Sequence, residues 1–298
     1  MGSRFEISAI HENKRTAKAA VMAAVSEIDR IENLISSWKS TSQTSEINAQ
    51  AGVKAVDVDQ ELFQLIKRSI KVSELTGGAF DITFAGLGDL WKFDGSMKSI
   101  PDTSEIEAKI ELVDYRHIEL NGDKASVFLK NKGMRIGFGA IGKGYAANRA
   151  KMVMKEHDIQ NGLVNAGGDL VAWGLNSEGE NWKIGIADPQ DHQKSIVWLE
   201  ISEMSVVTSG NYEKFIELDG TRYAHIIDPR TGFPVSGIKS VSVISPNAEV
   251  SDALATSIFV LGTKKGIELV NKLKNIECLI IDDENKFIQS NGLNLNFY

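Results

Sequence analysis

The sequence predicts an α+β fold in which a mainly antiparallel sheet packs against several helices. Short runs of alternating apolar residues, separated by glycine and proline, fill most of residues 162–245 and are typical of antiparallel strands. The segment YEKFIELDGTRYAHII (212–227) places an Asp219-Gly220 turn between two such runs, which is the strongest local signal for a hairpin. Residues 1–298 contain no repeat or clear linker, so we expect one domain, and the sequence leaves a two-lobed arrangement open.

The first part of the chain predicts a strand followed by two helices. Residues 4–10 alternate as a strand does, and residues 16–38 then have the helical period. A polar stretch separates this helix from a second one, which runs from Asp59 to Leu75 with Asp59 as N-cap and Gly77 beyond its end. The apolar stripe of the first helix consists of Val21, Val25, Ile28, Ile31 and Ile35.

The middle of the chain predicts a loop, a short helix, two strands and a glycine-rich turn. Residues 76–91 (TGGAFDITFAGLGDLW) are expected to form the loop, and residues 103–112 the short helix. Strands follow at 117–120 and 125–130. Residues 137–157 then predict a glycine-rich turn that opens into a helix.

The second half of the chain supplies most of the sheet. Beyond the hairpin we expect a strand at 238–245, a helix capped near Asn247, another helix near 264–274 and a strand at 277–283. Before the hairpin, strand-like runs occupy residues 162–174, 181–189, 195–202 and 205–210.

The composition argues against several classes of protein. With 298 residues, 42% of them hydrophobic, the chain can bury a large core. Its formal net charge of −7 and its lack of clustered Lys and Arg argue against a nucleic-acid partner. Cys278 is the single cysteine, so no disulfide forms within the chain. No stretch has the roughly 20 apolar residues of a membrane span, and the first residues lack the apolar centre of an export signal.

The segment GFGAIGKGYA (137–146) concentrates glycine just before a helix. Gly144 follows Lys143, so the segment lacks the Ser or Thr of a Walker A phosphate loop. Glycine permits close backbone approach, and the next helix offers unpaired N–H groups to an anion. A tight structural turn and a phosphate site both fit.

Three other loops carry polar groups. Asn165, Gly167 and Asp169 in NAGGDL, and the hydroxyls of TSGNY (208–212), fit turns as well as binding sites. HIIDPRTG (225–232) brings an imidazole, a carboxylate and a hydroxyl together within seven residues, which makes it a candidate for acid/base chemistry or phosphate contact.

The segment SDALATSIFVLG (251–262) places Asp252 and Thr256 four residues apart on one helix face. The simpler interpretation is that Asp252 caps its own helix and Thr256 bonds back to the preceding turn. The alternative is a Mg²⁺ site, since Mg²⁺ takes one or two protein oxygens and fills its other positions with water and phosphate oxygens.

Taken together, GAIGKGYA, NAGGDL, TSGNY, HIIDPRTG and SDALATS resemble the ApbE family of FAD:protein FMN transferases in order and spacing. The opening MGSRFEI, the stretch SSWKSTSQTSEIN (36–48) and TGGAFDITFAGLGDLWKF (76–93) extend the resemblance over nearly the whole chain. The resemblance implies a T-fold-like α+β architecture with a mainly antiparallel sheet.

The resemblance also implies a reaction. Members transfer FMN from FAD to a Thr or Ser hydroxyl of a target protein in a Mg²⁺-dependent step that releases AMP and leaves a phosphodiester bond. Their targets are flavin-bearing subunits of membrane redox complexes, such as the sodium-translocating quinone reductase. Many members are periplasmic or extracytoplasmic and lipid-anchored; this chain lacks the anchoring cysteine, as a mature or trimmed chain would.

Roles for individual residues follow from the resemblance. Asp252 and Thr256 match the metal ligands, with the backbone carbonyl of Ala140 as a third. His225 matches the base that takes the acceptor's proton, with Asp228 orienting it. The FAD groove is expected to consist of Trp38, which would stack on the flavin, and of Ala79, Phe80, Asp81, Lys143, Asn165, Gly167, Asp169, Thr208, Ser209, Gly210 and His225.

Two positions depart from the family pattern, and two other functions stay open. Gly137 stands where members carry Asp, and Asn148 where they commonly carry Asp. The same site would also suit a Mg²⁺-dependent FAD pyrophosphatase that yields FMN and AMP. An exported FAD-binding protein without turnover would need the groove but not the metal ligands.

Overall fold

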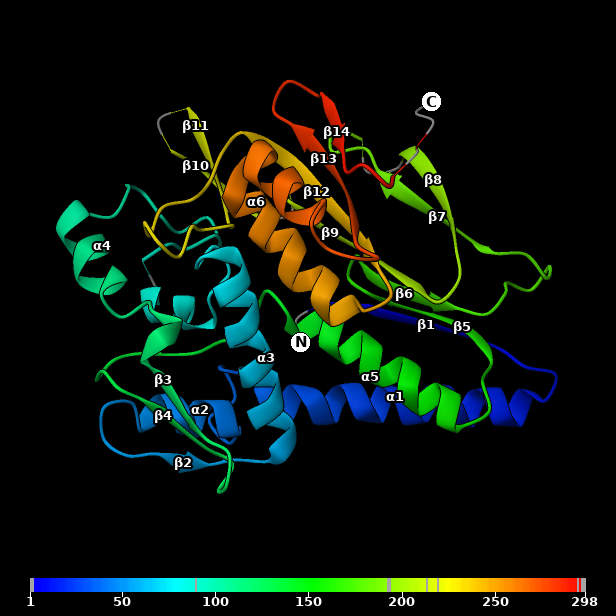
Figure 1. The fold of residues 1–298 in the computed structure, drawn as a ribbon, viewed down its shortest axis with the longest axis horizontal. Coiled ribbons are helices and arrows are strands. Elements are labelled where there is room, and N and C mark those ends of the chain that lie inside the picture. The colour runs from blue at the N-terminus through cyan, green and yellow to red at the C-terminus, as the bar shows by residue number, and fades with distance from the viewer. Residues whose placement is uncertain are drawn as a thin grey trace.

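The computed structural model describes residues 3–88, 90–191, 194–212, 214–218, 220–293 and 295. Its centre is a seven-stranded sheet in which every neighbouring pair is antiparallel, so the predicted fold class is confirmed (Figure 1). In spatial order its strands are β1 (Phe5–Ile10), β5 (Asn161–Ala166), β6 (Asp169–Trp173), β9 (Met204–Gly210), β12 (Ile238–Ser245), β13 (Glu277–Asp282) and β14 (Phe287–Gln289).

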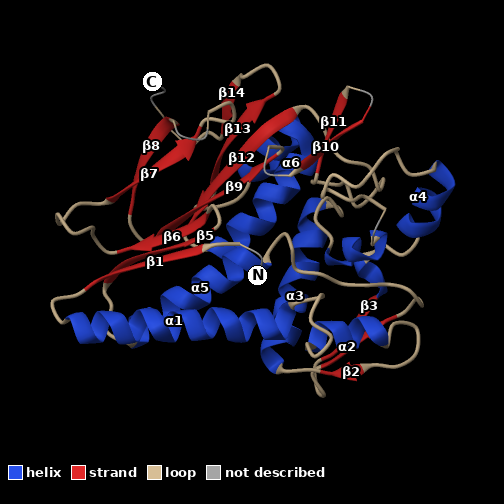
Figure 2. Ribbon diagram, turned by 180° about the vertical axis from the view of Figure 1, so that it is seen from behind, coloured by secondary structure: helices blue, strands red, loops and turns tan. Residues whose placement is uncertain are grey.

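Three helices cover one face of this sheet and a hairpin covers the other (Figure 2). The helices are α1 (Lys14–Ile35), α5 (Gly142–Glu156) and α6 (Ala248–Val270). The hairpin consists of β7 (Trp182–Ala187) and β8 (Ser195–Ile201), whose apolar side chains pack on those of β6 and β9. Both faces of the central strands are therefore buried, and β6 is buried at every position.

A second group of elements packs against α1 and the start of α5 through a separate hydrophobic core. It comprises α2 (Gln43–Ala49), α3 (Gln60–Thr76), the 3₁₀ helix η1 (Ile82–Leu87) and a small sheet with the order β2 (Val56–Asp57), β4 (Ser126–Leu129) and β3 (Ile118–Asn121). Helix α4 (Thr103–Ile110) and the hairpin β10 (Phe215–Leu218) to β11 (Thr221–Ala224) lie at the periphery (Figure 1). The 3₁₀ turn η2 (Tyr115–His117) directly precedes β3.

Several predicted boundaries are confirmed. Helix α3 starts after Asp59, although that side chain makes no capping hydrogen bond, and ends at Gly77 in the left-handed conformation that glycine favours. Gly262 has φ of 79° and ψ of 171°, which breaks α6 into the two helices that were expected there. The β10–β11 hairpin also forms as predicted, while Asp219 of its turn lies outside the described residues.

Other predictions are wrong in detail. Val25 of the predicted stripe on α1 is 46% exposed, whereas Ala20 and Ala24 are fully buried against alanines of α5. Small side chains let the two helices approach closely, and this geometry selects Ala over Val. The polar stretch after α1 contains α2, capped by Ser42, and the expected loop at 76–91 contains η1.

Candidate active site

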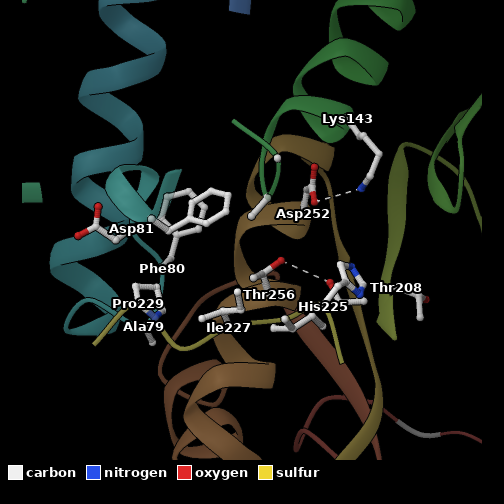
Figure 3. Close-up of a pocket in the computed structure, with 15 residues that line it drawn as sticks. Ala79, Phe80, Asp81, Lys143, Thr208, His225, Ile227, Pro229, Asp252 and Thr256 are labelled. Carbon is white, nitrogen blue, oxygen red and sulfur yellow. Dashed lines mark hydrogen bonds and ion pairs between the residues drawn. The ribbon is translucent and has the colours of Figure 1, made fainter. Parts of the chain in front are cut away.

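One cavity of about 210 Å³ gathers distant segments of the chain (Figure 3). Its wall combines the segment before η1, the turn before α5, the end of β9, the segment after β11 and the first half of α6. Ten residues of the predicted site lie on this wall: Ala79, Phe80, Asp81, Ala140, Lys143, Thr208, Ser209, His225, Asp252 and Thr256. Sequence reasoning assigned no role to Phe84, Gly139, Ile226, Ile227 and Pro229, which complete it.

Asp252 does not cap its own helix. The N-cap of α6 is Asn247, whose side chain accepts the Val250 N–H at 3.2 Å. The Asp252 side chain is 2% exposed, and its Oδ2 accepts the backbone N–H of Gly144 at 3.0 Å, in the first turn of α5. The dipole of a helix stabilises a carboxylate that lies at its N-terminus. Here the carboxylate belongs to α6, and the N-terminus that stabilises it belongs to α5.

Gly144 explains how the two helices come so close. A Cβ atom at this position would lie 2.1 Å from the carbonyl oxygen of Ala248 and 2.8 Å from Cβ of Asp252, so the contact requires glycine. In a regular helical turn the Gly144 N–H would donate to the carbonyl of Ala140, four residues earlier. Here it donates to Asp252, and no backbone N–H of the described residues donates to the Ala140 oxygen. Ala140 lies on the cavity wall, so its oxygen is a candidate ligand atom.

Thr256 adds a third oxygen. Its Oγ1 lies 3.5 Å from Oγ of Ser209 on β9, whereas the neighbouring Ser257 bonds back to the Ala253 carbonyl at 2.6 Å. Ser257 therefore makes the hydrogen bond to the preceding turn that the simpler interpretation assigned to Thr256. Carboxylate, hydroxyl and carbonyl oxygens form the donor set that Mg²⁺ prefers. Across the described residues no group of three or more His, Cys, Asp or Glu side chains could hold a metal, so an ion here would need oxygens from water or substrate.

Lys143 connects Asp252 to a second buried carboxylate. Its Nζ lies 2.6 Å from Oδ2 of Asp169. It also lies 3.5 Å from Oδ1 of Asp252, the ion pair that Figure 3 marks. Asp169 is 1% exposed and is absent from the cavity wall, where the sequence placed it. Burial and the nearby charge of Asp252 raise the pKa of Asp169, and the Lys143 ammonium opposes this rise.

His225 follows β11 and has a defined tautomer. Its Nδ1 lies 3.1 Å from the carbonyl oxygen of Lys214. A carbonyl can only accept, so Nδ1 carries the hydrogen and Nε2 of the neutral ring keeps its lone pair. Burial lowers the pKa of His225, against the effect of the hydrogen bond to the Lys214 carbonyl, and the charges of Lys214 and Lys143 also lower it, so the neutral ring is favoured.

The expected contact between Asp228 and His225 is replaced by another. Both carboxylate oxygens of Asp228 pair with Arg230, at 2.8 and 2.7 Å from its Nε and Nη2. The turn at Asp228-Pro229 brings Arg230 back onto the carboxylate, as the Arg230 N–H to Asp228 bond of 2.9 Å indicates. The imidazole is bonded to the Lys214 carbonyl, so Asp228 shapes the loop and does not orient the ring.

Asp81 builds the opposite wall. Its Oδ1 accepts hydrogen bonds from the backbone and hydroxyl of Thr83, and its Oδ2 accepts the Tyr115 N–H at 2.8 Å. The side chain therefore caps η1, and Figure 3 shows its carboxylate turned away from Asp252. Burial raises the pKa of Asp81, against the effect of these hydrogen bonds.

Besides Asp169, four predicted groove residues lie off the cavity wall. Trp38 is 87% exposed just beyond α1. Asn165 accepts the Gly168 N–H at 2.8 Å in the tight β5–β6 turn, where Gly167 has φ of 63°. Gly210 ends β9 beneath the ring of Tyr212. Residues 165–168 therefore form a turn, which is one of the two interpretations that the sequence left open for this motif.

The two departures from the family pattern also lie off the wall. Gly137 donates its N–H to the Ile82 carbonyl at 2.9 Å, and a Cβ there would lie 3.1 Å from Cβ of Ala85. Asn148 donates to Oδ1 of Asn247 at 2.7 Å and accepts the Ala248 N–H at 3.1 Å. The amide suits this position because it both donates and accepts, whereas an ionised Asp can only accept.

The ApbE family model matches residues 1–280. The chain belongs to the ApbE family. Among curated relatives, the "FAD:protein FMN transferase" of Treponema pallidum is 34% identical over 300 residues, covering 94% of this chain and 83% of the relative. One of Klebsiella pneumoniae is 34% identical over 272 residues, covering 91% and 84%.

Solved structures agree with this assignment. The ApbE protein of Thermotoga maritima superimposes with a TM-score of 0.90 at 31% identity, covering 98% of this chain and 94% of that one. The apo flavinyl transferase ApbE of Pseudomonas stutzeri gives a TM-score of 0.85 at 27% identity, covering 97% and 91%. The chain therefore has the α+β fold of the ApbE family, as the motifs led us to expect.

Proposed function

We propose that this chain is an FAD:protein FMN transferase, an enzyme that moves FMN from FAD onto a Thr or Ser hydroxyl of a flavoprotein. The observation that carries the proposal is the meeting of Ala140, Asp252, Thr256 and His225 in one cavity. Membership of the ApbE family and the names of the curated relatives support it. The two relatives named above each cover more than nine-tenths of this chain and have more than four-fifths of their own length covered, so the match concerns most of each protein.

The metal we propose is Mg²⁺, held by the Ala140 carbonyl, the Asp252 carboxylate and the Thr256 hydroxyl. The fit rests on the chemistry of the donors, which are all oxygens, and on the Ala140 oxygen, to which no backbone N–H of the described residues donates. When bound, such an ion would neutralise charge on the phosphates of FAD during phosphoryl transfer.

His225 is the proposed base. As the acceptor hydroxyl forms its bond to the FMN phosphorus, the bond from that phosphorus to the AMP oxygen breaks, and Nε2 of His225 takes the hydroxyl proton. The Lys214 carbonyl holds the required tautomer, and burial keeps the ring neutral. Lys143, at the first turn of α5, supplies a positive charge beside the substrate phosphates.

The acceptor we propose is a flavin-bearing subunit of a membrane redox complex, of the sodium-translocating quinone reductase type. We further propose that the protein works on the extracytoplasmic side, lipid-anchored in its full-length precursor. Both proposals rest on the resemblance of the motifs to the family. No helix among the described residues combines the length and the apolar character needed to cross a bilayer. Fractionation of cells that express the full-length gene would test the location.

One incubation separates the candidate functions. The protein is mixed with FAD, Mg²⁺ and a protein or peptide that carries a candidate acceptor hydroxyl, and all products are weighed by mass spectrometry. A transferase yields acceptor carrying FMN together with free AMP. Free FMN and AMP without modified acceptor would identify a pyrophosphatase, and unchanged FAD bound to the protein would identify a binding protein; either result contradicts the proposal.

A further inference from the structure

Two buried carboxylates, Asp252 on the cavity wall and Asp169 off it, share the Lys143 ammonium. The side chains of Asp169 and Asp252 are 1% and 2% exposed, and Lys143 Nζ lies 2.6 Å from the first and 3.5 Å from the second. The negative charge of Asp252 raises the pKa of Asp169. Two such groups without a counter-charge would be costly to bury, so the ammonium stabilises both.

The position of Lys143 also means that its ammonium would repel a metal ion bound to Asp252. Asp252 is the carboxylate that we assign to Mg²⁺, and a divalent cation on it would stand next to an ammonium already held there by Asp169. Two like charges beside one carboxylate repel each other, and the repulsion is stronger next to buried groups than in bulk water. A diphosphate entering the cavity has the opposite effect, since its negative charge is attracted by both cations.

We propose that Lys143 is an internal counter-cation that makes metal binding depend on substrate: it weakens the binding of an ion without FAD and strengthens the binding of the FAD diphosphate. Asp169 is the positioning residue that holds the ammonium in place. The ion therefore binds tightly after, or together with, FAD. This inference rests on the proposed function, because it takes Asp252 as the metal ligand.

The test measures binding and needs no turnover. Mn²⁺ serves as the probe, because it prefers oxygen ligands as Mg²⁺ does and its free form is counted by electron paramagnetic resonance. Lys143→Gln removes the charge and keeps an N–H donor. Without FAD, this variant is expected to bind Mn²⁺ at least about tenfold more tightly than the wild type, and without metal to bind FAD at least about tenfold more weakly.

Two further variants make the result specific. Lys155→Gln removes the same charge from the same helix, where the lysine pairs with Glu203 on the surface, and should leave both affinities unchanged. Lys143→Arg keeps the positive charge and should keep Mn²⁺ binding without FAD as weak as in the wild type. It preserves the test if Lys143→Gln fails to fold, since tight Mn²⁺ binding by Lys143→Arg would overturn the inference.

The outcomes separate this inference from the proposed function. Unchanged or weaker Mn²⁺ binding by Lys143→Gln, with normal saturable binding by the wild type in the presence of FAD, overturns the counter-cation role alone. Absence of saturable Mn²⁺ binding by the wild type with FAD overturns the metal site, and the inference with it.

Discussion

Replacing Asp252 by Asn tests the centre of the proposed mechanism. The substitution removes one negative charge and keeps the size of the side chain. An asparagine Oδ1 can still accept the Gly144 N–H that lies 3.0 Å from Asp252, so the contact between α5 and α6 survives. The cap of α6 is also untouched, because Asn247 provides it.

The expected effects on stability and activity therefore differ in size. Lys143 loses its weaker contact, at 3.5 Å, and keeps the one of 2.6 Å to Asp169, so the free energy of unfolding should change by less than about 1.5 kcal/mol. Loss of the only carboxylate among the proposed ligands removes several kcal/mol of charge stabilisation, which predicts a fall in kcat/KM of at least about a hundredfold. Thr256→Val should cause a smaller loss of the same kind.

The assay is FMN transfer followed by mass spectrometry across a Mg²⁺ titration, alongside urea denaturation. Raising Mg²⁺ should partly restore both variants. Asp59→Asn is the matched control, because it removes the same charge from an exposed helix start that makes no side-chain cap bond. A wild-type rate and a wild-type Mg²⁺ dependence for Asp252→Asn would show that the metal site is misplaced.

Three other substitutions test separate features. Trp38→Ala should raise the KM for FAD and leave kcat nearly unchanged, because stacking stabilises ground and transition states alike; steady-state kinetics that show a collapse of kcat would remove the flavin-stacking role of this exposed ring. His225→Ala should lower turnover by about 10²-fold to 10⁴-fold with little change in FAD affinity. In the wild type the activity should fall only as pH drops through a pKa below the usual His value of about 6.5, since burial favours the neutral base, and a pH–rate profile with a higher acid limb would contradict this. Asn148→Asp should lower the free energy of unfolding by about 1 kcal/mol in urea titrations, because it loses the donor to Asn247 at 2.7 Å, and an unchanged value would show that the cap tolerates a second acceptor.

Local signals in the sequence determined much of the secondary structure. The bounds of α3 follow from Asp59 and Gly77, and the break in α6 falls at Gly262, between the two helices that were expected. Such features depend on residues close together in the chain, since capping, left-handed glycine and alternation act over a few positions. The order of the motifs was also enough to indicate the family.

Elements whose stability depends on packing were harder to predict. Helix α2 is seven residues long and mostly polar, so its own composition favoured a loop, and contacts with α1 and β4 hold it. On α1 the structure buries Ala24 and exposes the predicted Val25, because α5 packs close to α1. Neither choice can be read from the segment alone.

The candidate site divides in the same way. Asp252 and Thr256 were singled out because four residues on a helix place them on one face, which is a local property. Only the tertiary structure shows that the Gly144 N–H donates to Asp252 and that no backbone N–H of the described residues donates to the Ala140 oxygen. It also shows that Lys143 pairs with Asp169 and that Arg230 pairs with Asp228. These contacts depend on distances between segments that lie far apart in the sequence, and the spacing of residues along the chain does not give those distances. For buried charges, such a distance sets the strength of the electrostatic interaction.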